Sequence, residues 1–486
     1  ISNGFQNRAS GCYSNASGRL SSASGAYSIA SGTCSSATGA YSSASGYNAI
    51  SGGSYSTSRG VCTTANGGYA IAQGLRAIAS GCYSNAIGIS ATASAYLSTA
   101  SGYQNSATST FATAWGSVTS ASGCQSFSRG VGAIASGQSS TAQGNFTTAS
   151  GVLSIAAGFG TTASGYCHAS IHNGLCNFIG NTTCSALANY GAVVNGNANN
   201  TTGGVWNGTA WTTAPTITNS GCHSFISNGF QNRASGAYSS ASGFRVVASN
   251  QYSTASAYFS TASGAFSRAS GNCATASGYH STASGYVTTA SGCWATTSGK
   301  QTSASANCFA SIHNGLCNFI GNTTCSAYAN YGVVVNGNAN NTSGGVWSGT
   351  AWTTAPSPTA SGCHSFISNG FQNRAGGSYS TASGRLSSAS GAYSIASGVC
   401  TIASNQASIA LGLNTTSSGI ISTASGYRTT ASNYLTIASG VLTTASGNYA
   451  IASGRSTTAS GAFSLASGRN TTASAACFAS IHNGLC

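Results

Sequence analysis

Glycine and other small residues recur along this chain with a period of seven, and larger or more polar residues fill fixed places between them. Glycine stands at every seventh position from Gly4 to Gly165, and over 23 steps only Ala95 and Ser109 replace it. Between glycines the pattern is x-x-Ser/Thr-x-Ala-Ser, as in residues 11–18. A period of this kind is typical of a stacked repeat structure, in which each repeat contacts its neighbours rather than one central core.

The spacing within a heptad indicates strands rather than helices. Glycine in every heptad opposes a helix. The third and fifth places after glycine are small, and residues two apart in a strand share one face, which we place inward. We therefore expect an all-β fold, a parallel β-roll or β-solenoid. Two heptads would close a flattened coil of about 14 residues, and coils would stack about 4.8 Å apart.

This interpretation assigns roles to particular residues. The small residues expected to point inward in the first coils are Ser14, Ala16, Ser21 and Ala23. The glycines expected to form the corners are Gly11, Gly18, Gly25, Gly32 and Gly39. In later blocks the glycine place is taken by Asn250, Ala257, Asn405 and Asn433. Asparagine tolerates a left-handed backbone, so its presence fits a tight corner there.

Heptad blocks alternate with a cassette that lacks the period. The heptad blocks are 1–165, 229–306 and 370–475, and the cassettes are 166–228, 307–369 and the start of a further one at 476–486. The two full cassettes are nearly identical and lie 141 residues apart. Residues 1–8 repeat the tail of a cassette, so we expect the chain to be a segment of a longer array. No signal peptide or transmembrane run is present in it.

Composition removes most catalytic chemistry. The chain has no Asp, no Glu and no Met, and its formal net charge is +14. Either the bias is real, or the sequence was inferred with acids entered as similar residues. As written, neither a carboxylate pair nor a Ser-His-Asp triad can be built, so we expect no enzyme and no cofactor. The basic residues are scattered, which disfavours a nucleic-acid surface.

Cysteine and histidine concentrate in the cassettes. The cassette cysteines are Cys167, Cys176, Cys184 and Cys222 in the first copy and Cys308, Cys317, Cys325 and Cys363 in the second. Their spacings are not the close Cys-x₂₋₄-Cys pairs of structural zinc, so we expect no metal. Two disulfides per cassette are the favoured interpretation, since four is an even number, and their connectivity stays open. Free buried thiols are the alternative.

Large aromatic residues occupy the first and second places after glycine or lie in the cassettes. The candidate interface or surface aromatics are Tyr13, Tyr27, Tyr41, Trp206, Trp211, Trp347 and Trp352. They would either pack between coils or chains, which is the favoured interpretation, or present a surface that binds glycans or a host.

Tandem Gly-x-x-Ser-x-Ala-x-Gly, as in residues 11–18, resembles the head repeat of trimeric autotransporter adhesins, the YadA-like heads, and of related phage and viral fibres. The resemblance covers the heptad blocks. It implies a left-handed parallel β-roll, three chains per fibre, and adhesion outside the cell. In this chain Ser, Thr or Asn commonly flank the Ala where the family places Val and Ile.

Three functions follow for testing. The favoured one is a structural extracellular fibre or filament on a cell surface, serving adhesion or as an appendage, with self-association into homotrimers or end-to-end filaments. A viral or phage fibre on the virion surface is a second. A monomeric solenoid that binds ice or glycan through Ser, Thr and Tyr arrays is a third.

Overall fold

The computed structural model describes residues 4–165, 168–180, 191–194, 205–206, 211–213, 222–305, 309–321, 332–335, 340, 346–347, 352–354, 364–475 and 478–485. They form strands and turns and contain no helix. Two compact units make up the chain, Ile1–Ser249 and Asn250–Cys486.

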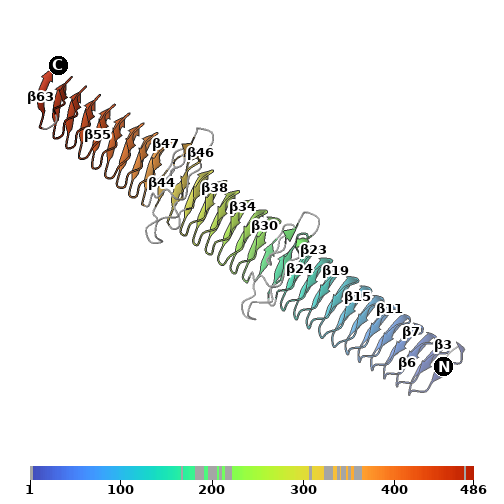
Figure 1. The fold of residues 1–486 in the computed structure, drawn as a ribbon. Helices are drawn as coiled ribbons and strands as arrows, with labels where there is room; N and C mark the ends of the chain where they lie inside the picture. Colours follow the sequence, from blue (N-terminus) through green and yellow to red (C-terminus); the bar gives the residue numbers. More distant parts are fainter. Residues whose placement is uncertain are drawn as a thin grey trace. The chain divides into compact units, whose positions relative to one another are not determined.

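Each coil of the first unit has one long and one short strand, although its two heptads have the same sequence pattern. The long strands have five residues, from β3 (Asn15–Arg19) and β5 (Ile29–Thr33) to β23 (Ile155–Phe159). The short strands have two, as in β4 (Ser22–Ala23) and β6 (Ser36–Ala37). Strands of each kind pair in parallel with the copy 14 residues further on (Figure 1). The predicted parallel β-solenoid with coils of about 14 residues is therefore confirmed.

The second unit repeats this architecture. Its long strands run from β34 (Thr254–Tyr258) to β40 (Thr296–Lys300) and from β49 (Thr381–Arg385) to β61 (Leu465–Arg469). The last strand, β63 (Ser480–Leu485), pairs with β61 in parallel. The 14-residue register holds in the heptad blocks of this unit, as in the pairing of Thr381 with Ile395, whereas β61 pairs with residues 15 and 16 further on in β63.

The interior of the coils is a narrow column of small side chains. Ala16 and Ala23 are fully buried, as are their equivalents in successive coils, and Ser21 is 1% exposed. Ser14, in the first coils, is half-buried. Small side chains allow the two sheets of a coil to approach closely, so the backbone itself, rather than large apolar residues, fills most of the core.

In most coils a hydroxyl at the third place after one glycine lies in the turn, although alanine takes this place in some, as at Ala70. The backbone N–H of Ser28 donates to the carbonyl of Gly25 at 3.2 Å, and its hydroxyl donates to the same carbonyl at 2.7 Å. Ser14 and Gly11 repeat the pair. Where both bonds form, the Gly-x-x-Ser turn satisfies its polar groups locally; at the same place the buried hydroxyls of Ser42 and Ser84 have no hydrogen-bond partner.

The expectation that glycine forms every corner is wrong for one of the two rows of glycines. Gly18 and Gly32 lie inside β3 and β5, while Gly11, Gly25 and Gly39 lie in turns without a positive φ. The left-handed residue is instead the second one after each glycine, such as Tyr13 (φ 57°). Its N–H bonds backwards along the stack: that of Tyr27, for example, donates to the carbonyl of Cys12 at 2.7 Å.

Glycine is needed because the coils approach each other closely. A Cβ on Gly18 would lie 2.1 Å from the carbonyl oxygen of Gly32 in the next coil. A Cβ on Gly11 would lie 2.1 Å from that of Gly25. Both rows of glycine therefore mark backbone contact between coils, whatever their φ.

The left-handed role proposed for asparagine at the glycine place is also wrong. Asn250, Asn405 and Asn433 lack a positive φ, and their side-chain amides donate to a carbonyl of the next coil at 2.9–3.2 Å. Asparagine replaces glycine there by bridging coils. Ala257, by contrast, stands at a strand glycine place and keeps φ 88°.

The first cassette adds coils to the long-strand sheet of its unit. After β23, the sheet continues through β25 (Ser170–His172), β27 (Ala192–Val194) and β30 (Phe225–Phe230), all parallel. Larger side chains fill the interior at the alanine places: Ile171, Ile179, Val193 and Ile226 are at most 2% exposed. The cassette breaks the heptad period without breaking the sheet.

The second cassette follows the same plan through β42 (Ser311–His313), β44 (Val333–Val335) and β47 (Phe366–Phe371). Each cassette also carries one antiparallel pair, β28 (Val205–Trp206) with β29 (Trp211–Thr213), and β45 (Val346–Trp347) with β46 (Trp352–Thr354). The backbones of Trp206 and Trp211 are register partners, as are those of Trp347 and Trp352.

Candidate functional site

A row of stacked tyrosines follows one corner of the first unit. Its members are Tyr13, Tyr27, Tyr41, Tyr55, Tyr69 and Tyr83, each 14 residues after the last. Successive ring centroids lie 4.8–4.9 Å apart and successive planes differ by 1–15°. The rings from Tyr27 onwards are about half exposed. Each ring therefore packs on its neighbours within the chain and also faces outward.

A mixed aromatic row occupies the corresponding corner of the second unit. Tyr252, Phe266, His280 and Trp294 stack with centroid distances of 4.9, 4.6 and 4.1 Å. Phe309 extends the row at 6.0 Å from Trp294. The corner position thus accepts flat side chains of different chemistry, which pack between coils in these rows.

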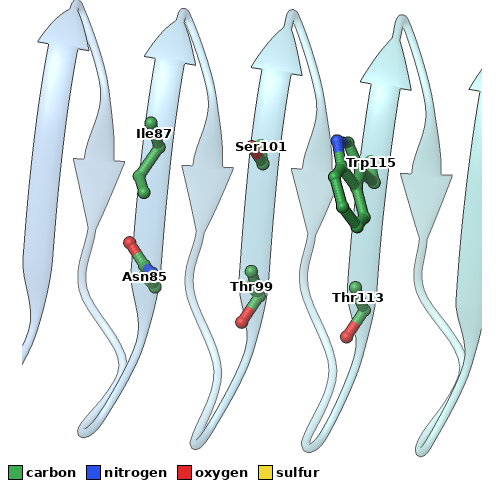
Figure 2. A pocket seen from close by; sticks show the side chains of 6 residues that line it. All are labelled: Asn85, Ile87, Thr99, Ser101, Thr113 and Trp115. Carbon is green, nitrogen blue, oxygen red and sulfur yellow. The ribbon is translucent and has the colours of Figure 1, made fainter.

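The outer face of the long strands contains a groove in the first unit. It crosses β13 (Asn85–Ile89), β15 (Thr99–Tyr103) and β17 (Thr113–Ser117), and its volume is about 220 Å³. Six side chains line it: Asn85, Ile87, Thr99, Ser101, Thr113 and Trp115. Figure 2 shows them on one face of three neighbouring strands.

The groove exists because one member of a side-chain row is small. Ile87, Ser101 and Trp115 are in-register partners on adjacent strands, so their side chains form one row across the sheet. Ile87 and Trp115 are 38% and 55% exposed. Ser101 between them leaves the space that a larger side chain would fill, and Figure 2 shows the indole at the edge of its own strand, on the side of Ser101.

Arg129 covers the other side of the indole. It is the next in-register partner of Trp115, on β19 (Phe127–Val131), and its guanidinium carbon lies 5.5 Å from the indole centroid. A cation over an aromatic face is attracted by the ring and restrains its orientation. Arg129 therefore restrains Trp115, whose other face is directed at Ser101.

A second row of polar side chains runs beside this one. Asn85, Thr99 and Thr113 are in-register partners, two residues before Ile87, Ser101 and Trp115 along each strand. The amide oxygen of Asn85 is buried and has no hydrogen-bond partner, and Figure 2 shows it turned toward Ile87. The groove thus combines apolar walls with hydroxyl and amide groups and contains no charged residue.

The expectation of two disulfides per cassette is wrong, because it needs all four cysteines of each copy and one in each copy is a free thiol. Cys176 and Cys317 are free thiols. Burial raises the pKa of both, partly offset for Cys317 by Lys300, so both thiols stay protonated near neutral pH. Cys222 is not a free thiol. Cys167, Cys184, Cys308, Cys325 and Cys363 lie outside the described residues, so disulfides among the remaining cassette cysteines stay a prediction.

Each cassette holds one short Ser–His contact. The Ser170 hydroxyl lies 2.6 Å from His172 Nε2, and that of Ser311 lies 2.7 Å from His313 Nε2. Both pairs are exposed, and the chain supplies no carboxylate to orient the imidazole. Among the described residues, no three potential metal ligands lie together. The same residues include no helix that is long and apolar enough to cross a membrane.

These features define a class: a parallel β-solenoid whose outer rows, rather than an enclosed pocket, offer binding surfaces. The chain matches the YadA head domain repeat at residues 128–152, 375–399, 431–457 and 452–474. No match was found among curated proteins. The matched segments are therefore YadA-like head repeats, as the sequence pattern indicates.

The groove residues are not among the candidates taken from the sequence. Those candidates were chosen by their place in the heptad, whereas Ile87, Ser101 and Trp115 become neighbours only through the 14-residue coil. The signal is nevertheless present: with the sequence written in lines of 14, this column contains a large, a small and a large residue in succession.

Proposed function

We propose that this chain is a segment of an extracellular surface fibre that serves adhesion or acts as an appendage. The observation that carries the proposal is the long-strand sheet, which continues within each unit through heptad blocks and cassettes alike and includes the YadA-like repeats. A stack of this kind grows in length with repeat number and gains little enclosed volume. It suits a spacer that holds binding surfaces away from a cell or virion.

Self-association would bury apolar side chains that a single chain leaves exposed. The outer long-strand face of the second unit exposes Ile395, Val399, Leu413, Ile437 and Val441, each 37–44% exposed. The family usually forms homotrimers, and a shared apolar face would bury these side chains between chains. We therefore propose a homotrimer for this fibre.

A cross-section of the native fibre at a resolution that counts chains tests this assembly. Three chains in one cross-section, with the aliphatic rows between them, are expected. One chain per cross-section would overturn the homotrimer and leave a monomeric solenoid. A fibre-dependent attachment assay on host cells or glycan-coated surfaces tests adhesion separately, and attachment equal to that of a fibre-free control would overturn that role.

A regular hydroxyl column favours surface binding as a second candidate function. Thr416, Thr430, Thr444, Thr458 and Thr472 are in-register partners on consecutive short strands and are half-buried or exposed. Such an array matches an ordered surface such as ice. If it binds ice, the purified chain inhibits ice recrystallisation and Thr444→Tyr, which adds bulk to the flat column, removes the effect. Inhibition that Thr444→Tyr leaves unchanged, or none by the unaltered chain, would reject this candidate.

A further inference from the structure

We propose that the groove over Ser101 is a subsite for one neutral hexopyranose ring of a glycan. The proposal rests on the adhesive function above and names the class of ligand for one surface of the fibre. Its test uses the purified chain and is therefore independent of the attachment assay.

The width of the groove suits a ring inserted between two walls. Ile87 and Trp115 are two coil steps apart, and the coil spacing seen in the tyrosine row is 4.8 Å. A ring over Ser101 would lie one step from each wall and complete the row. The volume of about 220 Å³ is below the ~300 Å³ at which pockets for larger ligands begin, so it holds one ring rather than an oligosaccharide.

The chemistry of the lining selects a sugar over other flat ligands. A pyranose presents C–H groups on its faces and hydroxyls around its edge. The faces match the Trp115 indole and the Ile87 side chain, and the edge matches the hydroxyls of Ser101, Thr99 and Thr113. A purely aromatic ring or a lipid chain would cover these polar groups without replacing their hydrogen bonds to water, which is unfavourable.

The ligand is neutral because no lining residue is charged. Arg129 is held on the far face of the indole, with one side chain between it and the groove. Trp115 is also restrained before a ligand arrives, so binding immobilises little that is free in the unbound chain.

The experiment is ligand-observed NMR of the purified chain with methyl glycosides of glucose, galactose, mannose and N-acetylglucosamine at about 10 mM, a concentration suited to the weak affinity of single sugars. At least one glycoside is expected to bind. Trp115→Ala is expected to weaken that binding at least tenfold, and Ser101→Trp to abolish it by filling the groove.

Trp294→Ala is the matched control. Trp294 is similarly exposed, at 48%, but stacks between His280 and Phe309 in the aromatic row of the second unit. Its removal should leave glycoside binding unchanged, and circular dichroism confirms that each variant keeps its β structure.

Three results would overturn the proposal. The first is that no glycoside binds. The second is that the unaltered chain and Trp115→Ala bind equally well. The third is that Trp115→Ala forms an assembly of lower mass than the unaltered chain does. The third result would assign the groove to a second copy of the chain. Because the fibre cross-section and the attachment assay are separate measurements, adhesion can hold while this subsite fails, and the reverse.

Discussion

At the scale of single residues, glycine serves backbone contact between coils. In β5, Gly32 has φ 126°, and a Cβ there would lie 2.1 Å from the carbonyl oxygen of Gly46. Gly68 has no positive φ, and the nearest atoms to an added Cβ are 3.9 Å away. A side chain is therefore excluded at Gly32 and has room at Gly68.

Gly32→Ala is therefore expected to lower the thermal unfolding midpoint strongly, by the equivalent of several kcal/mol, since both the contact and the backbone conformation resist a side chain. Gly68→Ala is the control and should be neutral or stabilising by about 0.5 kcal/mol, because it restricts the unfolded chain. Circular dichroism melting measures both. Equal midpoints for the two variants would contradict a requirement for glycine where the coils touch.

Buried hydroxyls give a second prediction at this scale. Thr443 is fully buried, and its hydroxyl has no hydrogen-bond partner. Thr443→Val keeps the shape and removes the unpaired group, so the variant should be as stable as the original or more stable by about 1 kcal/mol. A clear loss of stability on melting would indicate that the hydroxyl has a partner, such as a buried water.

At the scale of elements, the left-handed residues at the corners are strained, and aromatic stacking between coils offsets this strain. A non-glycine residue in the left-handed region costs about 1–2 kcal/mol, and Tyr55 (φ 60°) is one of many such residues. Tyr55 also stacks on Tyr41 and Tyr69 at 4.8 Å, and each aromatic pair contributes about 0.5–1.5 kcal/mol beyond burial. Stacking between successive coils therefore offsets much of the strain at the corners that aromatic residues occupy.

Buried asparagines connect the second cassette to the coils that follow it. Asn318 Oδ1 accepts from the N–H of Asn340 at 3.0 Å, and Asn340 Oδ1 from that of Asn373 at 2.8 Å. Asn373 Oδ1 in turn accepts from the N–H of Ser387 at 3.0 Å. This column keeps the interior paired while the heptad period is interrupted.

Asn373→Ala should lower stability by about 2–3 kcal/mol, because it leaves the buried N–H of Ser387 without its partner and removes the bond to the Gly384 carbonyl. Asn448→Ala is the control: this asparagine is exposed, and no side-chain hydrogen bond is seen for it within the described residues. Chemical unfolding monitored by circular dichroism compares the two. If both variants unfold at the same denaturant concentration, the asparagine column does not contribute to stability.

At the scale of the whole molecule, the absence of acidic residues predicts resistance to acid. Acid unfolding follows largely from protonation of carboxylates that are paired in the folded state, and this chain has no Asp or Glu. Lowering the pH from about 5 to about 3 should shift the melting midpoint by no more than about 2 °C. A large fall would mean that carboxylates are present, and peptide masses would then locate them.

The sequence predicted the parallel β-solenoid, its coil of two heptads and the alanine column, because each follows from a period that local residues carry. It did not show that the two heptads of a coil differ. Gly18 lies in a strand and Gly25 in a turn, although both stand in the same local pattern. The difference arises from closing the coil, which places one heptad on each side.

By itself, therefore, the sequence determined the period, the class of fold and the family of the repeat, since these depend on residues close along the chain. Only the tertiary structure decided which residues meet across coils: Ile87, Ser101 and Trp115 in one groove, and Asn318, Asn340 and Asn373 in one column. The physical reason is that stacking joins positions 14 or more residues apart, and the surfaces able to bind a partner are formed by that stacking.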